Sequence, residues 1–192
     1  KKRGDDVIEF PIAYDGLSVV IHKDNTWAGT MTVAELKKLW EPTSTVKKWS
    51  EIRAGWPDQP IKLYGPGTAS GTFEYFTEVI VGKSKSSRAD FTASEDDNVL
   101  VKGVAGDKNA LGYFGYVYYL HNKDKMKVVS IDTGKGAVTP SEQTIKDGTY
   151  KPLSRPIFIY VSKKALSRPE VKEFVTFYLK NASKLIPQVV YV

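Results

Sequence analysis

Two nearly continuous apolar runs lie near opposite ends of the chain, at residues 17–21 and 157–161. Runs of this kind are typical of strands that are buried on both faces, as in a parallel-type sheet. The second run belongs to a strand predicted over residues 153–161, and because proline cannot donate a backbone hydrogen bond, we expect Pro156 to interrupt it. For the same reason, we expect Pro11 to end the strand before it or to hold that strand at a sheet edge. Shorter apolar runs predict further strands at residues 7–10, 61–64 and 128–131 and within residues 109–120.

Apolar residues recur at helical spacing in several of the intervening segments. Thr32 and Glu35 form a capping box ahead of one such stripe, and the acidic cluster within residues 94–97 marks another helix start. We expect Pro140 at the first position of a short helix that stops at Gly148. The predicted stripes are Leu36, Leu39 and Trp40, then Phe73, Phe76, Thr77 and Ile80, and finally Val171, Phe174, Val175, Tyr178 and Leu179.

Strands therefore alternate with helices along the chain, and this alternation predicts an α/β fold. The two long apolar strands bracket everything between them. This arrangement indicates an inserted lobe whose two ends cross back to a shared partner lobe.

The composition is that of a folded chain with a substantial core. Of the 192 residues, 41% are hydrophobic and 12% are aromatic. The absence of cysteine excludes disulfides, thiolate metal sites and cysteine nucleophiles. The net charge of +6 fits nucleic acid, an anionic surface or an anionic small ligand as a partner. Because the lysines are scattered, we expect no nucleic-acid partner.

Glycine and hydroxyl residues are concentrated in the turn after the predicted strand at residues 61–64. Ser70, Gly71 and Thr72 fall where the next helix begins, so their backbone N–H groups lack partners inside the helix and lie at its positive end. Two hydroxyls beside these N–H groups would form an anion-binding site that needs no lysine. The alternative is an ordinary strand-to-helix connection that Ser70 or Thr68 caps.

This turn matches neither of two well-known glycine-rich motifs. A nucleotide P-loop needs Lys directly after its last Gly, whereas Thr72 follows Gly71 here. The nucleophile elbow of hydrolases would need glycine at positions 68 and 72, where this chain has threonine.

Other candidate residues have simpler explanations. The acidic cluster within Ser94–Asn98 does not match the spacing of a calcium-binding loop, and a helix start explains it better than a metal site. No local motif supports catalysis by His22 or His121. The aromatic run at residues 113–119 is read as core, with the mouth of a cleft as the alternative. We therefore expect no metal, no cofactor and no enzymatic activity.

At this point several segments, in order along almost the whole chain, resemble one family. The family is the phosphate-binding protein of bacterial high-affinity phosphate ABC transporters, which has a type II periplasmic-binding-protein fold. The segments are Pro11-Ile12-Ala13-Tyr14-Asp15-Gly16-Leu17, Leu36-Lys37-Lys38-Leu39-Trp40, Leu63-Tyr64-Gly65-Pro66-Gly67-Thr68, Ser70-Gly71-Thr72-Phe73-Glu74-Tyr75-Phe76, Thr92-Ala93-Ser94-Glu95-Asp96-Asp97-Asn98, Ala110-Leu111-Gly112-Tyr113-Phe114-Gly115 and Pro152-Leu153-Ser154-Arg155-Pro156.

The resemblance implies two lobes joined by crossover strands, with phosphate bound in the cleft between them. Residues 1–15 would form a partial first lobe and a crossover, and residues 16–153 the second, inserted lobe. Residues 154–192 would form the return crossover and the C-terminal part of the first lobe. The N-terminal part of the first lobe would be missing from this sequence. In the family that part supplies a carboxylate that accepts a proton from hydrogen phosphate and so discriminates against sulfate.

The resemblance also implies a role for the glycine-rich turn. In the family, a Ser-Gly-Thr at a helix start donates hydrogen bonds to phosphate, and this role carries over to Ser70, Gly71 and Thr72. Gly67 and Thr68 would support them from behind. The expected partners are inorganic phosphate and the membrane permease of an ABC transporter. The expected location is the bacterial periplasm or cell surface.

Two positions depart from the family pattern. Related proteins often have Asp where this chain has Ala69, and other branches have a phosphate-binding Arg where it has Pro66. The cation of the site is therefore unassigned, with Arg53, Arg88 and Arg155 as candidates. Alternative functions are the binding of another oxyanion, or a regulatory or interaction role for a domain that has lost its ligand. An enzyme acting on phosphate esters would need a metal site or a nucleophile and base, and the sequence contains neither pattern.

Overall fold

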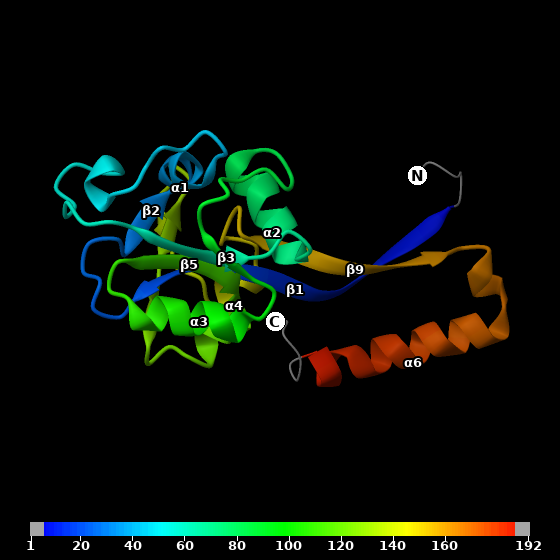
Figure 1. Ribbon diagram of the computed structural model, residues 1–192. Coiled ribbons are helices and arrows are strands. Elements are labelled where there is room, and N and C mark those ends of the chain that lie inside the picture. Colours follow the sequence, from blue (N-terminus) through cyan, green and yellow to red (C-terminus); the bar gives the residue numbers. More distant parts are fainter. Residues whose placement is uncertain (1–5, 187–192) are drawn as a thin grey trace.

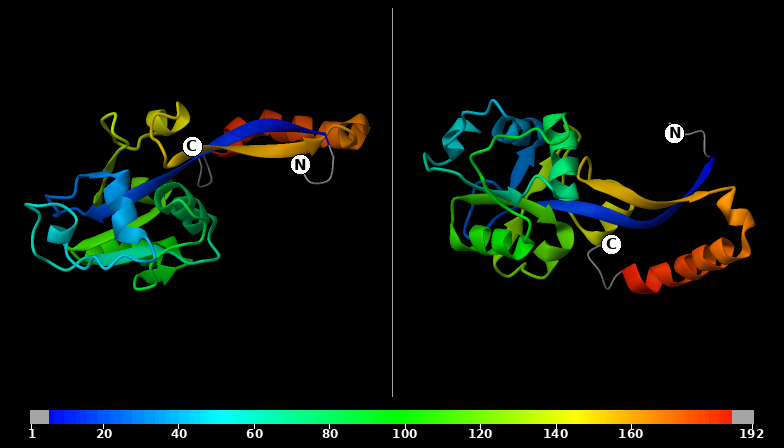
Figure 2. Two further views of the ribbon diagram at one scale, coloured as in Figure 1. Left: turned by 90° about the horizontal axis from the view of Figure 1, so that it is seen from above. Right: turned by 45° about the vertical axis from the view of Figure 1, so that its right-hand side comes forward.

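The computed structural model describes residues 6–186 and shows a rounded body from which a long arm extends (Figure 1). The arm consists of the first half of β1 (Val7–His22), β9 (Ser154–Ser162) and α6 (Pro169–Leu185). Both views in Figure 2 show α6 turning back from the tip of the arm toward the body. The outermost residues of the two predicted first-lobe segments, 1–5 and 187–192, lie outside the described part.

A six-stranded mixed sheet forms the centre of the body, in the order β4-β3-β5-β1-β6, with β9 paired to β1. β3 (Lys62–Pro66) runs parallel to β4 (Thr92–Ser94) and β5 (Ala110–Gly115). β1, by contrast, is antiparallel to β5, to β6 (Met126–Val128) and to β9. The run at residues 17–21 is fully buried as expected, but the prediction of parallel neighbours for it is wrong.

A second, three-stranded sheet is made of β2 (Thr30–Thr32), β7 (Ser130–Asp132) and β8 (Ala137–Val138). The single strand predicted over residues 128–131 is therefore divided between two sheets. The division falls at Val129, whose backbone N–H still donates to the carbonyl oxygen of Val19 at 2.8 Å. The chain leaves the first sheet there and enters the second.

Neither proline breaks its strand. β1 continues through Pro11, which lies opposite Phe158, and β9 continues through Pro156, which lies opposite Tyr14. Both prolines lie in the two-stranded arm, where β9 is the only strand that pairs with β1 among the described residues. A proline is tolerated at such an edge because its missing N–H group need not belong to the ladder. The arm accommodates Pro11 with a shift of register between Pro11 and Ala13.

The helices begin and end largely where the sequence predicts. α1 (Val33–Trp40) starts with the expected capping box of Thr32 and Glu35, and α2 (Gly71–Phe76) continues through a π-helical turn (Thr77–Val81) to Gly82. Asp96 caps α3 (Asp97–Gly106), and Pro169 is the first residue of α6. The remaining helical pieces are α4 (Tyr116–Leu120), α5 (Glu142–Lys146) and two 3-10 turns, Trp49–Glu51 and Ala165–Ser167.

The start of α5 differs by two residues from the prediction. Ser141 caps the helix by accepting the backbone N–H of Thr144 at 3.1 Å, so Pro140 lies before the cap and not at the first helical position. Gly148 follows the C-cap with φ of 70°, a conformation that favours glycine and stops the helix as expected.

An aromatic cluster fills the centre of the body. The rings of Phe76 and Tyr113 stack with centroids 3.7 Å apart, and Trp40 packs edge-on against Tyr113 at 4.9 Å. The arm has no comparable core within the described residues. Of the stripe predicted on α6, Val175 is buried, but Phe174 is 66% exposed. No helix within residues 6–186 is long and apolar enough to cross a membrane.

Candidate anion-binding site

The glycine-rich turn lies where two parallel strands end side by side. β3 and β4 are in register at Pro66 and Ser94, so the loops that follow both strands leave the same edge of the sheet. The backbone N–H of Gly67 donates to the carbonyl oxygen of Ser94 at 3.3 Å. The backbone N–H of Ser70 then donates to the carbonyl oxygen of Gly67 at 3.0 Å, which closes the turn before α2.

The first turn of α2 brings the three predicted ligand residues together. Ser70 is the N-cap, and its Oγ accepts the backbone N–H of Thr72 at 3.1 Å, which leaves the hydroxyl hydrogen of Ser70 available to donate. Among residues 6–186, the backbone N–H of Gly71 and the hydroxyl of Thr72 have no hydrogen-bond partner. A Cβ placed on Gly71 would meet no atom of another segment within 4 Å. The free donors therefore border open space.

Gly67 and Thr68 differ in their surroundings. Gly67 is buried, and a Cβ there would collide with the carboxylate of Glu95. Thr68 is exposed at the outside of the turn. A larger residue at position 67 would make the exposed Glu95 side chain move. The supporting role predicted for Gly67 and Thr68 stays a prediction.

Glu95 makes a contact that the sequence did not reveal. Its Oε1 accepts the backbone N–H of Ala69 at 3.3 Å, so a carboxylate from the loop after β4 lies beside the glycine-rich turn. The sequence contains only an indirect indication of this contact. The acidic cluster within Ser94–Asn98 and the glycine-rich turn each follow a strand, and parallel pairing of those strands puts them at one edge.

The remaining acidic residues of this loop begin α3, as predicted. Asp96 is the N-cap, and its side chain accepts the backbone N–H of Asn98 at 2.9 Å. Burial, with a smaller contribution from the neighbouring charges of Asp96 and Glu95, raises the pKa of Asp97 to about 6. No group of three or more metal-ligating side chains is found in the part of the chain that the structure describes.

Arg88, one of the three candidate arginines, is fully engaged in hydrogen bonds outside the glycine-rich turn. Arg88 is 4% exposed and donates to the carbonyl oxygens of Leu39 and Val46 at 3.1 and 2.9 Å, as well as to Asp90. It therefore stabilises the loop after the π-helical turn. Its charge is compensated by Asp90, and the hydrogen bonds that Arg88 donates to Asp90 are the main reason that the pKa of Asp90 is lowered.

Arg53 forms a closed ion pair of its own. Its Nε and Nη2 each donate to Glu35 at 2.7 Å, and its guanidinium lies 4.6 Å from the ring centroid of Trp56. Glu35 belongs to the capping box of α1, so this pair fixes the loop after α1 to the start of that helix. Arg155 is paired with Asp15 at 3.2 Å and lies beside α2.

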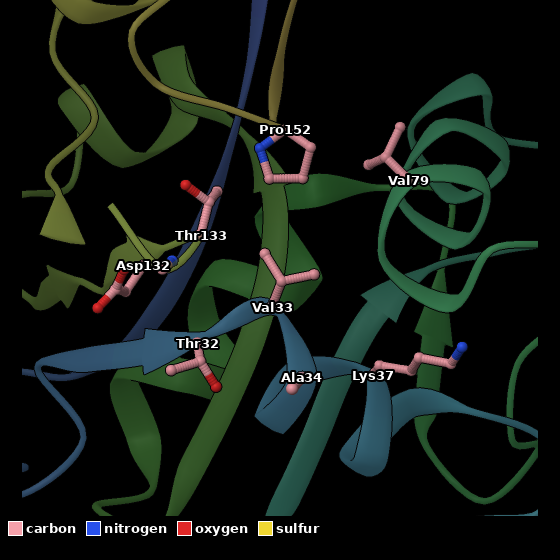
Figure 3. A pocket seen from close by; sticks show the side chains of 9 residues that line it. Thr32, Val33, Ala34, Lys37, Val79, Asp132, Thr133 and Pro152 are labelled. Carbon is pink, nitrogen blue, oxygen red and sulfur yellow. Dashed lines mark hydrogen bonds between the residues drawn. The ribbon is translucent and has the colours of Figure 1, made fainter. Parts of the chain in front are cut away.

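A separate cavity of about 690 Å³ lies between the start of α1 and the loop after β7 (Figure 3). Two of the polar side chains at its rim, those of Thr32 and Asp132, are already paired. The Thr32 hydroxyl takes part in the capping box, and Asp132 Oδ1 accepts the backbone N–H groups of Gly134 and Gly136. The Asp132 carboxylate would repel an anion, so this cavity is the poorer anion site. Its lining residues are Thr32, Val33, Ala34, Lys37, Val79, Asp132, Thr133, Gly134 and Pro152.

The histidines and the aromatic run have structural surroundings. His22 Nδ1 accepts the backbone N–H of Asp24 at 3.1 Å at the end of β1. His121 follows α4 as its C-cap and is exposed. In the aromatic run, Tyr113 and Phe114 are fully buried, which confirms the interpretation of those residues as core.

Comparison with known proteins identifies the family. The model of the PBP superfamily domain matches residues 1–182. The chain is 48% identical over 188 residues to protein SphX of Synechocystis, covering 96% of this chain and 56% of that protein. It is 39% identical to the phosphate-binding protein PstS of Staphylococcus haemolyticus, covering 96% of this chain and 57% of that protein. The chain therefore spans little more than half the length of these curated relatives.

Solved structures agree with this result. A "possible phosphate binding protein" from Planctomyces limnophilus is 55% identical, with a TM-score of 0.92, over 100% of this chain and 68% of that chain. A putative phosphate ABC transporter substrate-binding protein from Clostridium perfringens, solved with bound phosphate, is 25% identical, with a TM-score of 0.71, over 97% of this chain and 72% of that chain. The chain belongs to the PBP superfamily.

Proposed function

We propose that this chain is part of an extracytoplasmic solute-binding protein that captures inorganic phosphate and delivers it to the permease of a bacterial ABC transporter. The observation that carries the proposal is the first turn of α2. It presents a free backbone N–H at Gly71 and free hydroxyl donors at Ser70 and Thr72 beside open space, and the described residues contain no metal-ligating cluster. Binding without chemistry is therefore the function proposed.

The arm fits this proposal as the remainder of a second lobe. Residues 16–153 would form the inserted lobe, and residues 1–15 and 154–192 the crossover strands and part of the first lobe. The long pairing of β1 with β9 from Val7 to Gly16 is the kind of double crossover that such a division needs. Phosphate would then lie between the start of α2 and the first lobe.

The test is to remove the proposed donors one at a time. Ser70→Ala and Thr72→Ala should each weaken phosphate binding by about 1–3 kcal/mol, the usual cost of losing a hydrogen bond to a buried charged ligand. Binding is measured by calorimetry in two forms of the protein. One is the chain itself, and the other, called the restored protein, is a chimera that adds the part of the Planctomyces limnophilus relative that this chain does not cover.

A matched control separates ligand binding from helix capping. Ser141 caps α5 with the same type of hydrogen bond that Ser70 makes at α2. Ser141→Ala should therefore cost about as much stability as Ser70→Ala, roughly 1 kcal/mol, and leave phosphate affinity unchanged. Unchanged affinity in both Ser70→Ala and Thr72→Ala would show that the site lies elsewhere.

A further inference from the structure

Arg155 differs from the other two candidate arginines in where its ion pair lies. It stands directly opposite Asp15 in the pairing of β9 with β1, at the point where the arm leaves the body. Its Nε and Nη2 both approach Asp15 Oδ2 at 3.2 Å. The side chain of Asp15 is 13% exposed, whereas that of Arg155 is 40% exposed. The carboxylate is thus buried beneath a guanidinium that still reaches solvent.

The guanidinium of Arg155 also packs on a side chain of α2. It lies 4.0 Å from the ring centroid of Tyr75, a distance at which a cation and an aromatic face attract. The ring is held in place because the Tyr75 hydroxyl donates to the carbonyl oxygen of Pro152 at 2.7 Å. Arg155 is therefore positioned by three elements at once: β1, β9 and α2.

Tyr75 places this cation next to the proposed anion site. It follows Gly71 by four residues and Thr72 by three, so the three residues share one face of α2. Side chains in a helix lean toward its N-terminus, so the Tyr75 ring lies over the turn that contains Gly71. The space beside Gly71 is open. A guanidinium stacked on Tyr75 therefore lies on the side of α2 where the free donors are found.

Arg155 keeps donors available for a ligand. Asp15 takes up Nε and Nη2, and Nη1 has no hydrogen-bond partner among residues 6–186. Arginine has five N–H donors in a fixed fork, which suits the oxygens of phosphate. The pair with Asp15 would orient this fork before the ligand arrives, so that less side-chain entropy is lost on binding.

We infer that Arg155 is the cation of the phosphate site, held in position by Asp15 and Tyr75. This inference rests on the proposed function. Arg155 would take the place of the arginine that other branches carry where this chain has Pro66. This inference also explains how the turn can lack a cation of its own, because the positive charge comes from the crossover strand and not from the loop.

The test compares two arginines with closely similar surroundings. Arg53 and Arg155 are each paired with a carboxylate and stacked on an aromatic ring, and their side chains are 39% and 40% exposed. Phosphate is titrated by calorimetry into the restored protein carrying Arg155→Gln or Arg53→Gln. Arg155→Gln should weaken binding about 10- to 100-fold, the usual effect of losing a charge-assisted hydrogen bond, and Arg53→Gln should leave it unchanged.

Two further measurements distinguish an electrostatic contact between Arg155 and the ligand from a purely structural role of Arg155. Arg155→Lys should recover part of the lost affinity because it retains the charge. The preference for the dianion of phosphate over the monoanion, read from the affinity across the second ionisation of phosphate, should shrink in Arg155→Gln and persist in Arg53→Gln. Urea unfolding of each variant checks that it is folded.

The outcomes separate this inference from the proposed function. If the unaltered restored protein binds phosphate but Arg155→Gln binds as well as Arg53→Gln, the assignment of Arg155 is wrong and the function stands. Loss of affinity in Arg155→Lys equal to that in Arg155→Gln, with the dianion preference intact, would also overturn it. If the unaltered protein binds no phosphate, both the function and the inference fail.

Discussion

Asp97 lies in the first turn of α3, close to the loop in which Glu95 contacts the glycine-rich turn. Burial raises the pKa of Asp97 to about 6, and the negative charges of Asp96 and Glu95 act in the same direction. The positive end of α3 favours the ionised form, but it does not outweigh burial and two neighbouring carboxylates. Asp97 therefore changes its charge close to neutral pH.

This shift makes stability depend on pH with a definite sign. In the unfolded chain an Asp titrates near about 4, so between about pH 4 and 6 the folded state binds more protons than the unfolded state. The free energy of unfolding should fall as the pH rises through this window. Because Asp97 is partly accessible to solvent, the loss should be about 1 kcal/mol, less than the full shift would give.

Carboxyl-carbon NMR and urea unfolding measure this prediction. Asp97→Asn should remove the fall in stability, and Glu95→Gln should move the titration midpoint of Asp97 to lower pH. A midpoint near about 4 in the unaltered protein would contradict the environment described for Asp97.

At the scale of single residues, the sequence predicted the donors of the proposed site but could not choose among three candidate cations. Ser70 was recognisable because a hydroxyl residue at a helix start is a local signal. Arg155 was one of three candidates, since its partner Asp15 is 140 residues away and Tyr75 lies on a different element. Glu95 was missed for the same reason, because its contact with Ala69 depends on how two strands pair.

At the scale of elements, α3 packs closely on β3 at Gly103. A Cβ on Gly103 would collide with the ring of Tyr64 in β3. Gly106 is the last residue of the same helix, and a Cβ there would meet no atom within 4 Å. The two glycines therefore lie in the same helix but differ in the space available for a side chain.

Alanine at these two positions should have opposite effects on stability. Gly103→Ala should destabilise the protein by about 1–3 kcal/mol because either the ring or the helix must move. Gly106→Ala should be neutral or stabilising by up to about 1 kcal/mol, because alanine reduces the entropy of the unfolded chain and favours the helix. Urea midpoints at constant m-value measure both changes. A harmless Gly103→Ala would mean that α3 does not pack on β3 as described.

Helix starts were the most predictable elements, and strand limits the least. The caps at Thr32, Ser70 and Asp96 are local arrangements that the sequence contains in full. The effect of Pro11 and Pro156 depends on which neighbour each strand has, and the structure places both in a two-stranded arm. Strand direction could not be predicted either, because burial on both faces is compatible with parallel and with antiparallel neighbours.

At the scale of the whole molecule, the body has a complete core and the arm does not. Aromatic side chains on α6 stay exposed, with Phe174 and Phe177 each at 66%. Sequence periodicity predicted the apolar stripe of α6 correctly as a pattern, but it could not tell what covers that stripe. The proposed lobe division accounts for it, because the described arm would then be only a part of the first lobe.

The most direct test of the proposed function is a calorimetric titration of phosphate, with sulfate as the control, into the chain and into the restored protein. The proposed function predicts tight phosphate binding in the restored protein, little response to sulfate, and much weaker binding to the chain alone. Sulfate should fail because it carries no proton for the carboxylate expected in the restored segment. No heat with either anion in the restored protein would contradict the proposed function, and equal binding of both anions would indicate a different oxyanion receptor.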